Sequence, residues 1–252
     1  GRYMSDQREF SLTGYKSLIE GLIAHGYAIS SFRKADPESK HLIVRHDVDM
    51  CLDAAVKMAT LENELGVAAH YFVLLRTEMY NLFSENGLAA VEAILSLGHR
   101  VGLHLDASLY TEDELEDAAE WEAGCLQCVT GREVDMISFH RPAKSLLGHV
   151  GMLANRRHAY QPKYFTEMAY CSDSRGRWDH GHPLDLDAVK KGQALQLLTH
   201  PIWWTTTSAE SAVSRLDRLA TGRHQGLRTE LARNCDPYRE AYKELINDDE
   251  PL

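Results

Sequence analysis

Two aspartates stand one residue apart directly after a short apolar segment. Leu42-Ile43-Val44 leads into Arg45-His46-Asp47-Val48-Asp49. In an extended backbone successive side chains point to opposite faces, so Arg45, Asp47 and Asp49 share one face. Two carboxylates in one site repel each other unless a cation lies among them. The pattern therefore indicates a metal site, while an exposed acidic turn is the competing interpretation of an isolated Asp-x-Asp.

Three histidines occupy equivalent positions elsewhere in the chain. Each directly follows a short, largely apolar segment: His104 after residues 101–103, His140 after 137–139 and His200 after 197–199. A neutral imidazole can join a carboxylate around one divalent ion. One such histidine would be interpreted as structural, but three at equivalent positions indicate a shared site. Further candidates for a third ligand are Asp106, His180 and His182.

Other polar and aromatic side chains accompany these candidates. Arg141 comes directly after one of the histidines and could pair with a site carboxylate, and Asp173 follows Tyr170 after another apolar segment. Flat aromatic rings near a site can stack on sugars, so Trp204, Tyr170 and Tyr80 are candidate substrate contacts. Packing at the rim of the fold is the competing interpretation of these rings.

The strands and helices expected around these candidates indicate where in the fold they lie. Strands are expected at 42–49, 69–75, 101–105, 136–139, 168–171 and 195–198, and helices at 11–26, 52–65, 88–97, 111–128 and beyond Ser208. Alternation of strands and helices predicts βαβ units, a parallel sheet and, at this chain length, closure into a barrel. Parallel α/β folds place their sites at the carboxyl ends of the strands. The candidates at or just past such an end are Asp47 and Asp49, His104, His140, Tyr170 with Asp173, and His200.

Length and composition are those of a globular protein. The chain has 252 residues, with 44% hydrophobic and 25% charged residues. This length suits one α/β barrel or two small domains, and we expect one domain over residues 4–252. Residues 1–3, which precede Met4, are interpreted as an expression remnant.

Charge and cysteine content restrict the partners. With 27 basic and 37 acidic residues the formal charge is −10, which disfavours binding to nucleic acid or anionic lipid. The sequence shows neither a secretion signal nor a membrane span, so we expect a cytoplasmic protein. Among five cysteines, Cys125 and Cys128 supply only half of a tetrahedral zinc site and are expected to be helix residues that face the core.

In their order and spacing, these residues resemble the polysaccharide deacetylases, also called the NodB-homology family or carbohydrate esterase family four. The resemblance extends over residues 42–204 and five short motifs. The matching segments are His46-Asp47-Val48-Asp49, Gly98 to His104, Arg141-Pro142, Tyr170 to Ser174 with Trp178, and Leu198-Thr199-His200. In the second motif Ser108 replaces the family's second histidine, and His140 offers a replacement ligand. The His-Asp-Val-Asp form is similar to deacetylase-like proteins of bacterial surface-polysaccharide, lipopolysaccharide and O-antigen biosynthesis.

The resemblance implies an incomplete (β/α)7 barrel and a hydrolase that removes an acyl group, N-acetyl or N-formyl, from an amino sugar. One divalent metal ion, of the zinc type, would be held by Asp49, His104 and His140 and would polarise the acyl carbonyl. Asp47 would then be the base that takes a proton from water.

The resemblance also assigns the remaining roles. His200, held by Asp173, would give a proton to the departing amine, which is a poor leaving group unless protonated. Arg141 would keep Asp47 or Asp173 in its charged form. The expected partner is an amino-sugar or glycan substrate.

Two other functions stay compatible with the sequence. A relative that binds a glycan without cleaving it would explain the serine at position 108. A phosphoesterase barrel also uses Asp and His clusters, and two metal ions about 3.5–4 Å apart would favour it.

Overall fold

A computed structural model of the chain describes residues 8–247, so residues 1–3, interpreted as an expression remnant, lie outside the described residues. Contacts within the chain divide it into two compact units, residues 1–209 and residues 210–252. The expectation of one domain over residues 4–252 stays a prediction.

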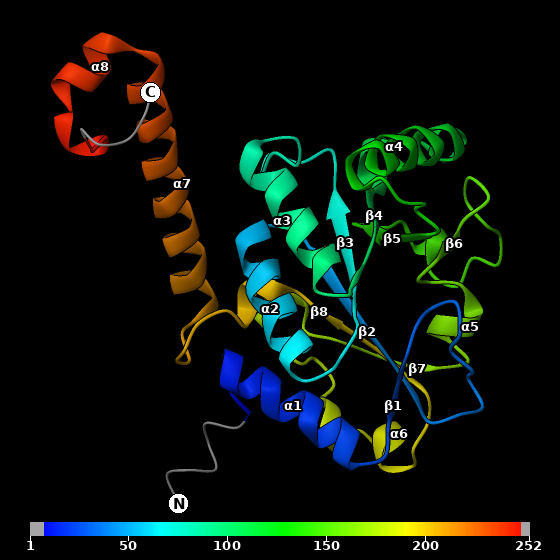
Figure 1. Cartoon of the computed structure of the whole chain (residues 1–252). Coiled ribbons are helices and arrows are strands. Elements are labelled where there is room, and N and C mark those ends of the chain that lie inside the picture. The colour runs from blue at the N-terminus through cyan, green and yellow to red at the C-terminus, as the bar shows by residue number, and fades with distance from the viewer. Residues whose placement is uncertain (1–7, 248–252) are drawn as a thin grey trace, which may run out of the picture. The chain divides into compact units, whose positions relative to one another are not determined.

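The first unit alternates strands and helices, as the sequence predicts (Figure 1). Its strands are β1 Ala28–Ser30, β2 His41–Val48, β3 His70–Leu74, β4 Arg100–Asp106, β5 Met136–His140, β6 Arg157–His158, β7 Ala169–Ser172 and β8 Leu195–Thr199. Its helices are α1 Leu12–Ala24, α2 Leu52–Glu64, α3 Glu85–Ser96, α4 Leu115–Thr130, α5 Pro162–Phe165 and α6 Asp187–Lys190.

All of these strands run parallel in one sheet. Their order is β6-β5-β4-β3-β2-β8-β7, and β1 pairs with the beginning of β2 beside this path. The path of seven strands ends at β6 on one side and at β7 on the other, so the sheet is an open, curled half-barrel. The predicted incomplete (β/α)7 barrel is confirmed.

The central strands are covered on both faces. Every residue of β3 and β8 is buried, and so is every residue of β2 except His41. Such strands appear in the sequence as continuous apolar runs, which is why these strands could be recognised. Helices α2 and α3 lie side by side against the sheet (Figure 1).

Helix boundaries follow local signals. The Ser11 hydroxyl accepts a hydrogen bond of 3.0 Å from the Gly14 amide, and so caps α1. Thr111 and Glu114 form a capping box, which opens a short 3₁₀ turn from which α4 continues. Cys125 and Cys128 lie on α4 as predicted, but Cys128 is exposed, so the expectation that both face the core is wrong.

The second unit is formed by α7 Ala212–Asn234 and α8 Asp236–Ala241. Ser211 caps α7, and α7 continues through Gly226. A glycine inside an exposed helix costs only about 1 kcal/mol, which a helix of this length tolerates. The two helices contact each other through Arg228, whose Nε donates to the Tyr238 hydroxyl at 3.1 Å. None of the described helices is both long and apolar enough to cross a membrane.

Candidate functional site

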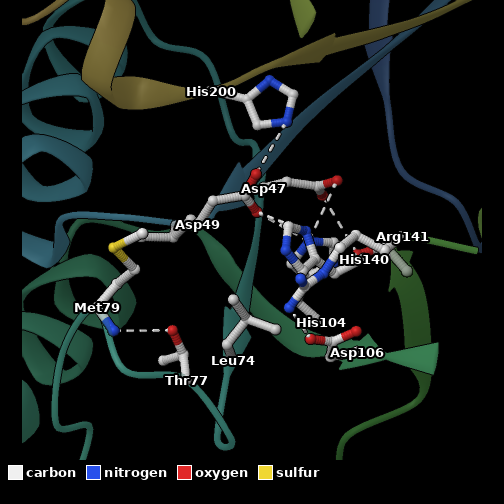
Figure 2. Close-up of polar contacts among 12 residues, drawn as sticks. Asp47, Asp49, Leu74, Thr77, Met79, His104, Asp106, His140, Arg141 and His200 are labelled. Carbon is white, nitrogen blue, oxygen red and sulfur yellow. Dashed lines mark hydrogen bonds and ion pairs between the residues drawn. The ribbon is translucent and has the colours of Figure 1, made fainter. Parts of the chain in front are cut away.

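The carboxyl ends of five strands bring the candidate residues to one edge of the sheet. Asp49 follows β2, His104 lies near the end of β4, and His140 is the last residue of β5. Asp173 follows β7 and His200 follows β8. Figure 2 shows Asp47, Asp49, His104, His140 and His200 pointing toward one another from these separate elements. The strand-end rule therefore predicted correctly that these side chains lie together at one edge of the sheet.

Asp49, His104 and His140 form a compact group, called the triad below. Asp49 Oδ1 lies 3.0 Å from His104 Nε2 and 3.5 Å from His140 Nδ1. One atom from each side chain can be chosen so that all three lie within 4.8 Å of one another, and no other such group of His, Cys, Asp or Glu occurs within residues 8–247. Three ligand atoms at this spacing can surround one metal ion.

A buried serine determines which nitrogen of His104 carries the proton of the neutral ring. The Ser138 hydroxyl donates its single proton to Asp47 Oδ1 at 3.2 Å, so it must accept from His104 Nδ1, which lies 2.7 Å away. In a neutral ring, the other nitrogen of His104 then presents its lone pair to the carboxylate of Asp49. Two acceptors face each other there, and only a proton or a cation between them relieves the repulsion.

The remaining triad groups have charge states that suit a cation. Burial lowers the pKa of His140, which favours the neutral ring that a metal requires. Burial alone would raise the pKa of Asp49, but the neighbouring imidazoles of His104 and His200 outweigh this, and the pKa lies below its usual range. The triad therefore offers two imidazoles and one carboxylate.

Asp47 lies beside the triad and is clamped by an arginine of its own strand. Arg45 Nε and Nη2 donate to the two oxygens of Asp47 at 3.0 and 2.7 Å, and both side chains are buried. Arg45 is held in turn by Gln196 and by the hydroxyl of Tyr160. Burial favours the protonated acid, but the charge of Arg45 outweighs it and holds the pKa of Asp47 well below its usual range.

His200 and Asp173 form a second charged pair on the other side of the triad. His200 Nδ1 lies 2.7 Å from Asp173 Oδ1, and Nε2 lies 3.5 Å from Asp49 Oδ2. Asp173 is fully buried and also accepts from the indole of Trp204 at 2.7 Å. Burial alone would lower the pKa of His200, but the charge and hydrogen bond of Asp173 outweigh burial and raise it to about 9.

Arg141 does not make the expected contact with Asp47 or Asp173. Its Nη2 donates to Asp106 Oδ2 at 2.6 Å, and its side chain is 63% exposed. The backbone at Arg141 is left-handed, with φ of 51°, which directs the side chain away from Asp47. Arg45 occupies the place that Arg141 was expected to fill.

The predicted aromatic substrate contacts are placed differently from the expectation. Trp204 is 1% exposed and packs against Phe10 and Tyr15, so it cannot stack on a sugar. The buried Tyr80 joins two strand ends, because its hydroxyl donates to Val48 O at 2.7 Å and accepts from Leu74 N at 2.8 Å. Rim packing, the competing interpretation, applies to both.

Tyr170 and two of the alternative ligands, His180 and His182, do not belong to the triad. The Tyr170 ring is half-buried against Tyr160 and Phe165. His182 caps a short turn by accepting from Leu184 N at 3.2 Å, and neither His182 nor His180 belongs to a ligand group within residues 8–247.

A second polar group, called the inner cluster below, lies on the opposite face of β2. It consists of Tyr15, His46, Glu62, Tyr71 and Thr199. His46 Nε2 lies 2.7 Å from Glu62 Oε2, and His46 Nδ1 lies 2.6 Å from the Thr199 hydroxyl. The hydroxyls of Tyr15 and Tyr71 both donate to Glu62. His46 therefore has partners for both of its ring nitrogens within the fold.

A cleft of about 530 Å³ opens at the triad. Its walls include Asp49 and His140 together with Arg76, Glu78, Asp106 and Arg141. A molecule of substrate size can therefore reach two of the three triad residues from solvent. Sequence reasoning did not find Arg76 or Ser138, since nothing in their local pattern distinguishes them from other strand or loop residues.

Neither a protein-family model nor a curated protein matches the sequence. The structure is similar to a family 4 carbohydrate esterase from Bacillus anthracis at 16% identity and a TM-score of 0.43, over 82% of this chain and 86% of that one. It is also similar to the chitin deacetylase from the fungal pathogen Colletotrichum lindemuthianum at 12% identity and a TM-score of 0.49, over 78% and 86%. A CE4 family pseudoenzyme from Bacillus anthracis is similar at 13% identity and a TM-score of 0.39, over 74% and 63%. We assign neither a family nor an activity to this chain from similarity at this level.

Proposed function

We propose that the protein is a metal-dependent hydrolase that removes an acyl group from the nitrogen of an amino sugar. One observation carries the metal part of this proposal. His104 Nε2 and His140 Nδ1 converge on a single oxygen of Asp49, at 3.0 and 3.5 Å, on the side of His104 that Ser138 leaves without a proton. The unprotonated His104 Nε2 and the carboxylate of Asp49 are both acceptors, so a cation between them is more favourable than their direct contact.

The donor set suits an ion of the zinc type. Two imidazoles and one carboxylate are a ligand combination of catalytic zinc sites, which keep one further position for water or substrate. A divalent ion held by Asp49, His104 and His140 would act as a Lewis acid toward an acyl carbonyl and would make a neighbouring water more acidic. The cleft supplies the route by which substrate reaches this position.

Asp47 is the base in this proposal. Its Oδ2 lies 3.7 Å from His104 Nε2, so it stands at the border of the triad without being one of the ligands. Arg45 keeps Asp47 ionised at every working pH, and it also makes Asp47 a weak base. Asp47 can therefore take a proton only from a water that is already acidified, which ties its role to the metal.

His200 is the proton donor. It lies on the far side of Asp49 from His140, and Asp173 holds it charged near neutral pH, with a pKa raised to about 9. A protonated ring beside the site can give its Nε2 proton to a departing amine, which would otherwise leave as an unstable anion. A base and an acid thus flank the triad on two sides, as hydrolysis of an amide requires.

The nature of the substrate comes from the motifs rather than from the geometry. The ordered segments from His46 to His200 resemble those of carbohydrate deacetylases, which motivates an N-acetyl or N-formyl amino sugar of bacterial surface-polysaccharide or O-antigen biosynthesis. A two-metal phosphoesterase is the weaker candidate, because the described residues offer one ligand group and not two adjacent ones.

Metal content and amine release test this function together. We expect the purified wild-type protein to bind about one zinc per chain and to release free amine from N-acylated amino sugars. Asp49→Ala and His140→Ala should lose both properties, because each removes one of three ligands. His149→Ala, which changes an exposed histidine outside the triad, should retain both.

Each result has a distinct meaning. Wild-type protein that stays metal-free in excess zinc would contradict the hydrolase. Protein that binds one zinc at the triad and glycan in the cleft, yet releases no amine from any N-acylated sugar, would instead be a glycan-binding relative.

A further inference from the structure

The wall of the cleft beside the triad contains two arginines, Arg76 and Arg141. The chain has a formal charge of −10, so an anionic molecule is repelled on average. Apart from Asp49 and His140, the charged residues among the described residues of the cleft wall are Arg76, Glu78, Asp106 and Arg141. Of the two acids, Asp106 is 3% exposed and already accepts from Arg141, so it presents little charge to the cleft.

Both arginines are held in place and yet keep donors for a ligand. Arg141 uses one nitrogen, Nη2, for its contact with Asp106. Arg76 lies over the ring of Tyr110, with its guanidinium carbon 5.3 Å from the ring centre. A guanidinium has five N–H groups in a planar fork, and such forks match the oxygens of phosphate groups. The arginines come from the ends of two different strands, β3 and β5.

The backbone conformation at Arg141 directs its side chain into the cleft wall. Arg141 has φ of 51°, a left-handed conformation that costs a bulky residue about 1 kcal/mol or more. Left-handed backbone at Arg141 separates its side chain from that of the adjacent ligand His140. His140 faces Asp49, while Arg141 reaches Asp106 in the cleft wall.

The uncharged part of the wall does not resemble a site for a long sugar polymer. The described residues of the wall include Leu74, Met79 and Leu109 but no aromatic side chain. Flat rings that stack on successive sugars are therefore missing among the described residues of this wall. A volume of about 530 Å³ is in the usual range for one small molecule.

We propose that the substrate is an N-acylated amino sugar that carries a phosphate or diphosphate group, and that Arg76 and Arg141 bind this group while the acyl group lies at the triad. The inference rests on the proposed hydrolase function and specifies its substrate class. The phosphate could belong to a simple sugar phosphate or to a nucleotide sugar, since both present the same anionic oxygens.

The test measures binding to metal-free protein. Binding requires no catalytic activity, and no metal is then present that the phosphate could contact directly. Titration calorimetry compares N-acetylglucosamine, its 1-phosphate and UDP-N-acetylglucosamine. We expect at least one phosphorylated compound to bind about tenfold or more tightly than the neutral sugar, the effect of a charge-assisted hydrogen bond. Arg76→Gln and Arg141→Gln should each reduce the preference for the phosphorylated compound about tenfold. Arg100→Gln, which changes an exposed arginine at the first residue of β4, should leave the preference unchanged.

The two phosphorylated compounds distinguish the two sources of phosphate. Tighter binding of the nucleotide sugar assigns the cleft to a diphosphate, and tighter binding of the 1-phosphate assigns it to a simple sugar phosphate. Equal binding of all three compounds would overturn the inference, and so would a preference that survives both substitutions.

Amine release by the zinc-loaded protein separates this inference from the function on which it rests. Equal release from the neutral and phosphorylated sugars would leave the hydrolase standing and overturn the phosphate inference. Phosphate-dependent binding that both arginine variants lose, without release of amine from any compound, would support the phosphate site and contradict the hydrolase.

Discussion

Two groups of histidine and carboxylate side chains lie on opposite faces of β2, next to the consecutive residues His46 and Asp47. His46 belongs to the inner cluster with Glu62, and Asp47 lies beside the triad. In the inner cluster each acceptor meets a donor, because two tyrosine hydroxyls donate to Glu62 and the hydroxyl of Thr199 contacts His46. In the triad, acceptors gather around one oxygen of Asp49.

The difference separates a polar group that stabilises the fold from one that fits a ligand. Residue type does not distinguish the two groups, because both combine imidazole with carboxylate. Hydrogen-bond satisfaction does, since buried polar groups are normally paired, whereas in the triad the lone pair of neutral His104 faces the carboxylate of Asp49 without a donor between them. The inner cluster should therefore respond to substitution through stability, and the triad through metal binding.

The largest effect should come from breaking the inner cluster. Glu62→Ala leaves the buried His46 and two tyrosine hydroxyls without their acceptor, so we expect the free energy of unfolding to fall by about 4 kcal/mol. Urea unfolding measures this loss. Glu64→Ala, on the same helix but exposed, should change stability by no more than about 0.5 kcal/mol. Equal effects of the two substitutions would show that the inner cluster does not stabilise the fold.

The sequence was sufficient to predict the triad because two simple rules apply to it. Alternation along a strand placed Arg45, Asp47 and Asp49 on one face, and the strand-end rule brought His104 and His140 to the same edge. Neither rule requires knowledge of which strands are neighbours. The alternation of strands and helices along the chain predicted the parallel barrel and the position of most of its strands, and the resemblance to the deacetylases implied that the barrel is incomplete.

The contacts that tune the site depend on strand pairing and could not be predicted. Ser138 appears in the sequence as one more residue of a strand, and it becomes a partner of His104 only because the register of β4 and β5 places the two opposite each other. The contact of Arg141 with Asp106 depends on one left-handed backbone angle. β1 and β6, with three and two residues, are too short to show any periodicity.

A buried histidine without a carboxylate partner extends the comparison, because its contribution to stability depends on pH. His70 is buried, and burial lowers its pKa to about 3. The unfolded chain, with a pKa of about 6.5, binds a proton first as the pH falls, so stability is lost on acidification from about 6.5 downward. His70 should account for about 2 kcal/mol of the loss between pH 6.5 and 5. His70→Gln should show a smaller loss than wild type in urea unfolding at both pH values, whereas the exposed His224→Gln should behave as wild type.

Ser138 tests whether the triad depends on the residue that orients it. Ser138→Ala removes the acceptor for His104 Nδ1, so the ring can take the other tautomer and turn a proton toward Asp49. We expect zinc affinity to fall about tenfold or more, the usual effect of removing such a partner. Competition with a coloured zinc chelator measures the affinity. Ser138→Cys, which keeps a weak donor and acceptor of similar size, should lose less; equal affinity of alanine variant and wild type would mean that Ser138 does not orient the ligand.

The smallest effect on stability is expected at the triad itself, and it decides the comparison. Asp49→Asn in metal-free protein keeps the shape of the side chain. It loses the contact of the carboxylate with charged His200 but also removes its repulsion with the lone pair of His104, so the free energy of unfolding should change by no more than about 0.5 kcal/mol. Added zinc should stabilise wild type by about 2.7 kcal/mol at a hundred times its dissociation constant, and should not stabilise the variant. Thermal unfolding with and without zinc measures both quantities. If Asp49→Asn destabilised the metal-free protein as strongly as Glu62→Ala, the triad would be a second structural cluster, and the proposed metal site would have to be abandoned.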